Sequence, residues 1–250
     1  MPPKTYRDNF FEYHLQGALS SAEAVVPVVR EYIQPVSVVD IGCGIGAWLS
    51  VWKKSGVNKI SGIDGEYVDT SKLLIEKSEF KAFNLENNFT SGEKYDLVTC
   101  LEVAEHIHPS SAEKFIGSLC ALGNIILFSA AIPGQEGTLH INEQYPEYWV
   151  ALFRKNGFVP IDCLRARIWN DKRIQWWYRQ NIIFFVKESA LADHPKLNEL
   201  ALKNGEVRAL VHPEMLREKM QKITYYESVL NSGKAILKYF LSNFFGKKKE

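Results

Sequence analysis

The 250-residue sequence lacks the features that mark several large classes of protein. No apolar run approaches the roughly 18 residues of a membrane-spanning helix, and the N-terminus carries no apolar signal core. We therefore expect a cytoplasmic protein that is neither secreted nor integral to a membrane. The formal net charge is only +1 and no separate binding module is evident, so nucleic acid is not an expected partner.

Cysteine is scarce and scattered. The four cysteines, Cys43, Cys100, Cys120 and Cys163, form no C-x-x-C pair, and this spacing favours free thiols in a reducing compartment. Cys43 and Cys100 fall in segments that we expect to be buried. With 46% hydrophobic and 24% charged residues, the chain has the composition of a soluble globular protein with one sizeable core.

The most informative segment that is present joins an apolar strand to a glycine-rich loop. Residues 38–46 read VVDIGCGIG, which predicts a buried parallel strand turning directly into a ligand-binding loop. Gly42, Gly44 and Gly46 let the backbone turn tightly and approach a ligand, which side chains there would obstruct. The dinucleotide pattern G-x-G-x-x-G is absent because the third glycine comes one residue early. The preceding Asp40 favours a cationic ligand over a pyrophosphate.

A second strand ends in Asp64, where a Rossmann-like fold places a carboxylate on ribose hydroxyls. With this order of strand, glycine loop, helix, strand and acid, the chain resembles the class I S-adenosylmethionine-dependent methyltransferases. The resemblance implies that S-adenosylmethionine is the cofactor and that Asn84 and Leu85 lie beside its adenine, although an ordinary turn is the alternative for these two. The residues expected to bind the cofactor are Asp40, Gly42, Cys43, Gly44, Gly46, Asp64, Asn84, Leu85 and Leu101.

Strand and helix patterns alternate up to residue 187, as in a doubly wound sheet. We expect strands over residues 38–41, 59–64, 79–83, 95–100, 124–130, 158–163 and 174–186. Helices are expected directly after the glycine loop and over residues 20–33, 111–122 and 145–156. The expected fold is α/β, a Rossmann-like seven-stranded methyltransferase fold, and the resemblance pairs its last two strands as an antiparallel hairpin. The expected domains are a methyltransferase domain, residues 1–187, and a helical C-terminal extension, residues 188–250.

Two acids and a histidine follow the fourth expected strand. If a helix begins there, Glu102, Glu105 and His106 fall at i, i+3 and i+4 and project to one side. Two carboxylates and an imidazole can hold a divalent cation such as Mg²⁺. The segment also resembles the E-x-x-E-H element of ubiquinone-pathway O-methyltransferases and small-RNA 2′-O-methyltransferases, which implies a metal beside the substrate hydroxyl. The alternative is that the acids complement a helix dipole and that His106 packs near the cofactor.

A long loop with one proline, two glycines and a polar cluster follows the fifth expected strand, where a substrate lid belongs. Its His140 is the candidate general base, because an imidazole titrates near neutrality and can take a proton from a hydroxyl. His140 is also a candidate metal ligand, and a purely structural histidine is the third alternative. Glu105 and Glu143 are the other candidate catalytic residues.

Aromatic residues alternate with arginines near the last expected strand. One face could stack on a sugar or aromatic ring while Arg179 and its neighbours hold a phosphate or carboxylate, whereas strand alternation assigns about half of the aromatics to the core. With the His140–Gln144 stretch, this region resembles small-molecule methyltransferases of bacterial surface-polysaccharide and natural-product pathways. That resemblance spans approximately residues 15–187.

The C-terminal segment has a different character. Apolar residues recur at helical spacing over residues 214–231, and the segment beyond Gly233 mixes apolar bulk with lysines. We expect a helix that covers the domain, makes a homo-oligomer contact or lies peripherally on an anionic membrane surface.

Together these patterns predict an enzyme that transfers a methyl group from S-adenosylmethionine to a hydroxyl of a small polar metabolite. The first candidate acceptor is a sugar or nucleotide-linked sugar of a surface-polysaccharide or natural-product pathway. One alternative is a quinone-precursor O-methyltransferase at the membrane. The other is a catalytically silent, cofactor-binding partner protein, against which the intact Asp40, Asp64, Glu105 and His140 argue.

Overall fold

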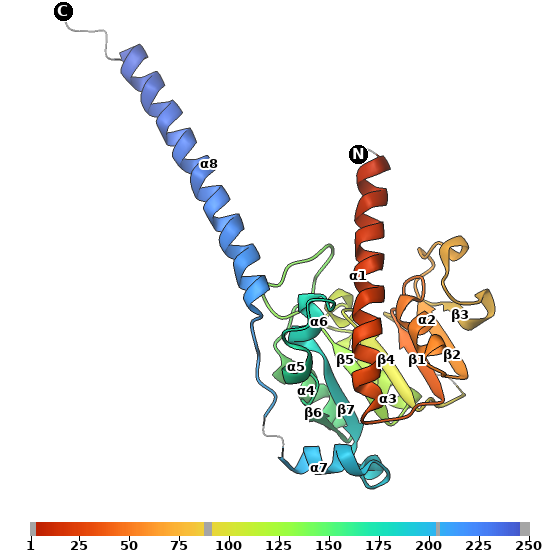
Figure 1. Ribbon diagram of the computed structural model, residues 1–250. Helices are drawn as coiled ribbons and strands as arrows, with labels where there is room; N and C mark the ends of the chain where they lie inside the picture. The colour runs from red at the N-terminus through yellow and green to blue at the C-terminus, as the bar shows by residue number, and fades with distance from the viewer. Residues whose placement is uncertain (1–3, 88–91, 204–205, 246–250) are drawn as a thin grey trace, which may run out of the picture. The chain divides into compact units, whose positions relative to one another are not determined.

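The computed structural model describes the backbone of residues 4–87, 92–203 and 206–245, and within these ranges the side chains from residue 15 to residue 238. The chain divides into two compact units, residues 1–210 and 211–250. The first contains the sheet and its helices, and the second contains the long helix α8 (Figure 1). The expected division between residues 187 and 188 stays a prediction.

Seven strands form one sheet in the order β3-β2-β1-β4-β5-β7-β6, which confirms the expected Rossmann-like methyltransferase fold. The strands are β1 Ser37–Ile41, β2 Lys59–Asp64, β3 Phe80–Ala82, β4 Leu97–Leu101, β5 Ile125–Ser129, β6 Phe158–Ile161 and β7 Ile183–Lys187. Neighbours are parallel from β3 to β5, whereas β7 runs antiparallel to both β5 and β6. The strand order reverses between β1 and β4 (Figure 1), and ligands of open α/β sheets bind beyond the carboxyl ends of the strands at such a point.

Helices cover both faces of this sheet. The first unit contains α1 Lys4–Arg30, α2 Ala47–Lys54, α3 Ala112–Leu122, α4 Pro146–Lys155, α5 Arg165–Ile168, α6 Trp176–Asn181 and α7 Pro195–Lys203, with the 3₁₀ turns η1 Thr70–Lys72, η2 Lys77–Glu79, η3 Ala104–His106 and η4 Glu188–Asp193. The second unit consists mainly of α8 Pro213–Phe245, which includes the expected helical segment 214–231. None of the helices in the described ranges combines the length and the apolar character that crossing a bilayer requires.

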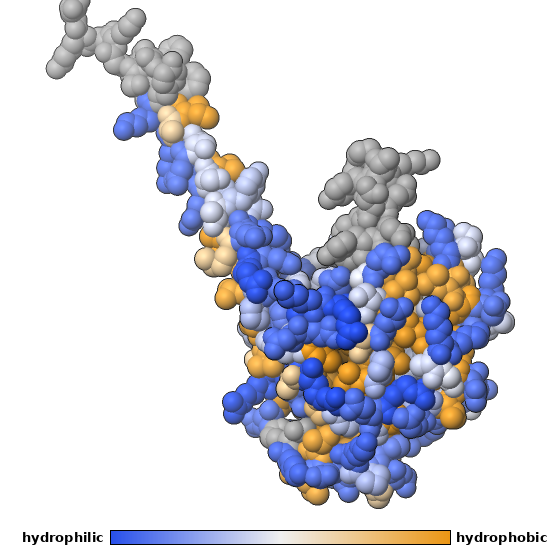
Figure 2. All heavy atoms as spheres, in the orientation of Figure 1, coloured by the Kyte–Doolittle hydropathy of each residue, from blue (hydrophilic) through white to orange (hydrophobic). Residues whose placement is uncertain are grey.

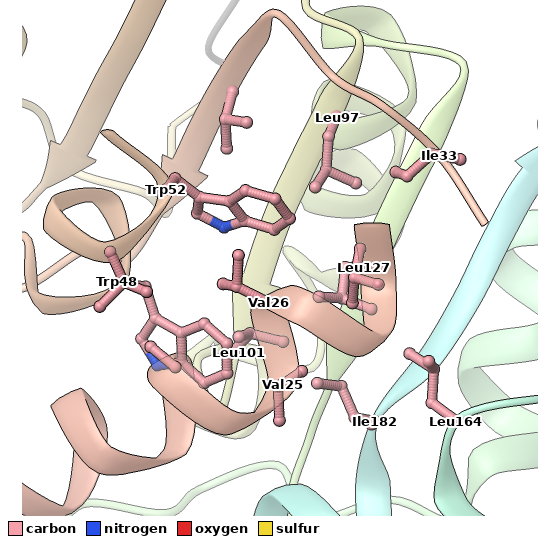
Figure 3. Close-up of a cluster of buried hydrophobic side chains, with 14 of the residues drawn as sticks. Val25, Val26, Ile33, Trp48, Trp52, Leu97, Leu101, Leu127, Leu164 and Ile182 are labelled. Atoms are coloured by element: carbon pink, nitrogen blue, oxygen red, sulfur yellow. The ribbon is translucent and has the colours of Figure 1, made fainter. Parts of the chain in front are cut away.

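Two apolar clusters hold these layers together. Adjacent residues of β1 enter different clusters, because Val38 packs with α1 and α2 whereas Val39 packs with α3 and α4. Figure 3 shows Trp52 of α2 near Val26 of α1 and Leu97 of β4. Burial of both faces explains why the central strands read as continuous apolar runs. The packed sheet therefore gives a fixed base to the loops that follow β1, β2, β4 and β5.

The expected strand over residues 174–186 is wrong in its first half. Residues 176–181 form α6, and only Ile183–Lys187 pair with the neighbouring strands. Strand β5 is five residues long, and its pairing with β7 ends at Phe128 and Ile183. An extension of β7 toward residue 174 would therefore have no residues of β5 with which to pair. Aromatic residues favour strands because they pack well on half-buried surfaces, and here α6 buries Trp176 and Tyr178 instead. The antiparallel pair of β6 and β7 is therefore linked through α5 and α6 rather than by a tight turn.

Candidate active site

Two cavities open beside the glycine loop, and Gly42 lines both. The smaller, about 210 Å³, is lined by the loop together with Trp48, Leu101 and Tyr178. The larger, about 850 Å³, is lined by residues from the ends of, or the loops after, five strands, β1, β2, β3, β4 and β5. Of the residues expected to bind the cofactor, those that line one cavity or the other are Asp40, Gly42, Cys43, Gly44, Asp64, Asn84, Leu85 and Leu101.

The need for glycine has a different structural cause at each of the three positions in the loop. All have positive φ, 78° at Gly42, 54° at Gly44 and 84° at Gly46. A Cβ at Gly42 would lie 2.3 Å from the side chain of Val103, whereas a Cβ at Gly44 would meet nothing within 4 Å. Gly46 precedes the first residue of α2 and lines neither cavity, and a Cβ there would lie 3.0 Å from Ile75. Gly42 and Gly44 therefore shape the cavity wall, while Gly46 starts the helix.

Asp40 places a buried carboxyl group in the wall of the smaller cavity. It is 3% exposed, and Thr99 Oγ1 donates a hydrogen bond to its Oδ1 at 2.6 Å. Burial raises the pKa of Asp40 to about 7, and the nearby charge of Asp64 adds to this effect. A cationic group in this cavity would favour the ionised form of Asp40, as expected from the sequence.

Asp64 ends β2 with both carboxylate oxygens engaged. Oδ2 accepts from the backbone N–H of Gly44 at 2.6 Å, and Oδ1 accepts from the N–H of Gly65 at 2.6 Å and from the hydroxyl of Tyr67. A Cβ at Gly65 would lie 2.2 Å from the ring of Tyr67, so this glycine lets the ring fold back over the chain. Sequence reasoning missed Tyr67, although an aromatic residue two positions after the Asp-Gly pair was a usable signal. Its hydroxyl holds a position on Asp64 that a ribose hydroxyl could take.

Asn84 and Leu85 lie in the wall of the larger cavity, as expected. Asn84 Oδ1 accepts a hydrogen bond from the backbone N–H of Glu86 at 3.0 Å, which is a local turn of the chain. The ordinary turn that the sequence analysis gave as the alternative for these two residues is therefore present. Contact of either residue with an adenine stays a prediction.

The predicted helical face of Glu102, Glu105 and His106 does not form. Only the single turn η3, Ala104–His106, is helical, and Glu102 lies before it with a φ of 56°. The carboxylate of Glu102 accepts hydrogen bonds from Gln135 Nε2 at 2.8 Å and from Asn181 Nδ2 at 3.1 Å. Gln135 and Asn181 are buried and also bond to each other at 2.9 Å. Sequence reasoning missed this network, apart from noting polar residues around Gln180 in an otherwise apolar segment.

A different trio of potential metal ligands comes together instead. One ligand atom from each of Glu105, His106 and His140 lies within 4.8 Å of the others. Glu105 is completely buried, and neither of its carboxylate oxygens has a hydrogen-bond partner in the described part of the chain. Burial raises the pKa of Glu105 well above its ordinary value, and the charge of Glu102 raises it further. Glu102 lies outside this group, whereas His140, the further ligand candidate from the sequence, lies within it. Metal binding by these residues stays a prediction.

Hydrogen bonds orient both imidazole rings of this trio. His140 Nδ1 lies 2.9 Å from Glu143 Oε1, and His106 Nδ1 lies 3.2 Å from the carbonyl oxygen of Leu139. A carboxylate and a carbonyl only accept, so each Nδ1 carries the proton and each Nε2 keeps a lone pair when the ring is neutral. The ring centroids are 4.9 Å apart at an interplanar angle of 85°. Burial lowers the pKa of His106, with the charge of His140 as the second cause.

Glu143 organises the loop that carries His140. Its carboxylate also accepts from the backbone N–H groups of Gly134 at 2.8 Å and Glu136 at 2.7 Å. None of the three catalytic candidates, Glu105, His140 and Glu143, lines the larger cavity. His106, which was predicted as a metal ligand, does line it. Glu143 is therefore placed to position His140 rather than to touch a ligand.

Backbone strain is concentrated in the loops after β4 and β5. In the described ranges, the residues other than glycine with positive φ are Glu102, Glu136 and Leu139, at 56°, 61° and 63°. Such conformations are unfavourable for these residue types and cluster at ligand sites. Leu139 is 79% exposed and Ile141 54% exposed, and both line the larger cavity. They form an exposed apolar lip of this cavity.

Two of the arginines near α6, Arg165 and Arg179, serve the interior, whereas Arg167 and Arg173 are exposed. Arg165 is buried and bonds to Asp162 and to the carbonyl oxygens of Gln180 and Arg208. Arg179 is buried too, with Nη1 3.1 Å from the carbonyl oxygen of Trp169. The interleaved binding face that a strand would present is thus absent from these residues. Tyr178 does line the smaller cavity, and its ring packs on Trp48 at a centroid distance of 5.2 Å.

Comparison with known proteins agrees with this architecture. A curated relative, the ubiquinone biosynthesis O-methyltransferase of Actinobacillus pleuropneumoniae serotype 7 (strain AP76), is 28% identical over 132 residues, which is 45% of this chain and 56% of the relative. The chain thus matches only about half the length of that relative.

Two solved structures share the fold. The sugar N-methyltransferase KedS8 from Streptoalloteichus sp ATCC 53650 has a TM-score of 0.56 at 14% identity over 72% of this chain and 92% of its own. The magnesium protoporphyrin IX methyltransferase of Synechocystis PCC 6803, solved with bound SAM, has a TM-score of 0.51 at 20% identity over 69% and 80%. The family model described as a methyltransferase domain matches residues 11–193. The chain therefore belongs to the methyltransferase-domain family, as its sequence predicted.

Proposed function

We propose that the protein transfers a methyl group from S-adenosylmethionine to a hydroxyl of a small polar metabolite, with a sugar or nucleotide-linked sugar as the first candidate. The observation that carries this proposal is that one cavity of about 850 Å³ is lined by both Asp64 and His106. A carboxylate suited to ribose and a polar cluster suited to a hydroxyl therefore face the same space.

The residues present fit S-adenosylmethionine. The loop at Gly44 leaves open the space that a Cβ would fill, and the buried Asp40 has a pKa raised to about 7 in the absence of a cation. When bound, S-adenosylmethionine supplies a methyl group on a positively charged sulfur atom. Asp64 accepts the ribose hydroxyls once the hydroxyl of Tyr67 releases Oδ1, and Asp40 compensates positive charge.

His140 is our candidate for the base that receives the acceptor's proton. Glu143 keeps hydrogen on Nδ1, so Nε2 can take the proton from the acceptor O–H as that oxygen is methylated. His140 lies behind His106 rather than in the cavity wall, so this role requires the loop over residues 136–142 to adjust around the acceptor. His106, which lines the cavity, orients the hydroxyl.

A divalent cation fits the same cluster. The buried, unpartnered carboxylate of Glu105 and two imidazoles within 4.8 Å form a set of donors that suits a transition-metal ion better than Mg²⁺, which prefers oxygen ligands. Glu105, His106 and His140 would hold the ion, and this role of His140 is the alternative to its role as the base, because both use the lone pair of Nε2. The ion would lower the pKa of an acceptor hydroxyl and orient it. In that case Glu143 would act behind His140 as the carboxylate partner of a metal-binding histidine.

A quinone precursor at a membrane is the second candidate acceptor. The curated relative is a ubiquinone biosynthesis O-methyltransferase, and the exposed Leu139 and Ile141 give the cavity an apolar lip. An aromatic acceptor with an apolar tail would cover these side chains, whereas a nucleotide-linked sugar would leave them in water.

The deciding experiment incubates the protein and S-adenosylmethionine with separate panels of nucleotide-linked sugars and hydroxylated aromatic compounds. Mass spectrometry then searches each panel for a product that has gained one methyl group, with the Asp64→Ala variant as the matched control. Product from the sugar panel supports the first candidate, and product from the aromatic panel supports the second. Binding of S-adenosylmethionine without product favours a catalytically silent partner, and absence of binding by folded protein contradicts the methyltransferase proposal itself.

A further inference from the structure

Helix α8 exposes large apolar side chains along most of its described length, visible as orange residues in Figure 2. From the middle of the helix onward, five of these side chains are each between 50% and 63% exposed: Tyr226, Val229, Leu230, Ile236 and Leu237. Soluble proteins rarely leave contiguous apolar surface uncovered unless another surface binds it. This set of five residues, here called the apolar sector of α8, therefore indicates an interaction surface.

The shape of the sector distinguishes between possible partners. At about 100° per residue, its five side chains spread over an arc of about 120° around the helix. This arc is wider than the narrow two-position seam of a two-stranded coiled coil and matches the broad apolar face of a helix that lies in a lipid interface. Lys234 and Lys238 follow just beyond the edge that Leu230 forms, so this border carries only positive charge on the C-terminal side of Glu227, which lies on it about two turns before Lys234.

The charge pattern points to the same kind of partner. From Ser228 to Lys249 the sequence contains five lysines and no acidic residue, together with aromatic residues at 239, 240, 244 and 245. Anionic headgroups attract lysines beside an apolar helix face. Two parallel copies of such a segment would instead bring Lys234 and Lys238 of both chains together, two to three turns away from Glu227.

We propose that α8 docks the protein on the surface of an anionic lipid bilayer. The apolar sector enters the boundary between headgroups and acyl chains, and Lys234 and Lys238 meet the lipid phosphates. The inference rests on the second unit alone and is independent of the methyl acceptor. It goes beyond the methyl transfer proposed above, because it assigns the protein a working location at a membrane surface.

The test is co-sedimentation of the full-length protein with vesicles of phosphatidylcholine alone or with about 30% phosphatidylglycerol, at low and high salt. We expect binding to the anionic vesicles that weakens with salt. Each lysine near such a surface contributes about 1 kcal/mol, so the K234E/K238E variant should bind at least about tenfold more weakly. The control K94E/K172E makes the same change of net charge at exposed lysines of the first unit and should bind like the wild type. The I236S/L237S variant should also lose binding, with an unchanged unfolding midpoint showing that the fold survives.

Three results would overturn the proposal. The first is equal retention by neutral and anionic vesicles, and the second is equal loss of binding in K94E/K172E and K234E/K238E. The third is absence of sedimentation combined with a lipid-independent dimer, seen by light scattering and dissociated by I236S/L237S. That third result would assign the apolar sector to a second copy of the chain.

Discussion

The buried carboxyl of Asp40 links the stability of the ligand-free protein to pH. Burial raises its pKa from an ordinary value of 3.8 to about 7. A carboxyl that holds its proton more tightly in the folded than in the unfolded chain makes the free energy of unfolding fall as pH rises from the unfolded to the folded pKa. The contribution of Asp40 to the free energy of unfolding therefore changes between pH 3.8 and about 7, and this contribution is larger at the acidic end of that range.

The size of the effect follows from these two pKa values. At about 1.4 kcal/mol per pH unit the full window corresponds to about 4 kcal/mol, of which about 2.5 kcal/mol falls between pH 5 and pH 8. Asp40→Asn preserves the size of the side chain and removes its ionisation. Relative to the wild type, this variant should gain about 2.5 kcal/mol in free energy of unfolding between pH 5 and pH 8, because the contributions of all other groups cancel in the comparison.

Urea unfolding followed by tryptophan fluorescence at the two pH values measures this difference. Trp48 and Trp52 lie on α2, directly after the glycine loop, and report on the same region. The control is Asp69→Asn, because Asp69 is exposed and its pKa is lowered by hydrogen bonds from Ser71, so it is ionised at both pH values. Parallel stability profiles of wild type and Asp40→Asn would refute the argument that burial controls this carboxyl.

Three further predictions concern the site. Asp64→Ala should weaken S-adenosylmethionine binding by about 1–3 kcal/mol, because the ribose hydroxyls lose a charged partner. Tyr67→Phe should tighten binding, because it frees Oδ1 of Asp64. Calorimetry measures both affinities, and weaker binding by Tyr67→Phe would show that the tyrosine contacts the ligand instead. His140→Ala should lower the turnover number by about 10² to 10⁴ with cofactor affinity within a few-fold of wild type, and near-normal turnover would leave His140 a structural loop residue. Exhaustive chelation should abolish activity and Mg²⁺ or Mn²⁺ should restore it; activity that survives chelation removes the cation from the mechanism.

The strands and the glycine loop on one side of the site could be predicted because their determinants are local in the sequence. A strand buried on both faces must be apolar, and a loop that turns sharply after it needs glycine, so the segment from Val38 to Gly46 carries its own explanation. The same holds for β2 and Asp64, which the structure places beside Gly44 through a hydrogen bond of 2.6 Å. Local sequence patterns were therefore sufficient to predict β1, the glycine loop and β2.

The acceptor side depends on contacts that no local pattern encodes. Glu102, Gln135 and Asn181 meet from three separate segments, and their hydrogen bonds engage the carboxylate for which a metal role was predicted. The left-handed backbone at Glu102 prevents the helical face on which that prediction relied. Helix α6 escaped prediction because aromatic side chains suit any half-buried surface, and only the short β5 determines where β7 begins.

The loop after β5 shows how one carboxylate can define a site without regular secondary structure. Glu143 binds two backbone N–H groups and one imidazole, so the turn of residues 134–136 and the orientation of His140 share a single anchor. From the other side, the N–H groups of Ile141 and Asn142 both donate to the carbonyl oxygen of Glu105 at 3.0 Å, which ties the loop to η3. Because both histidines and Glu105 are held by this one arrangement, a disturbance of the anchor should move all three together. The effects of removing Glu143 and His140 should therefore be far from additive, as expected when one residue acts only through the other.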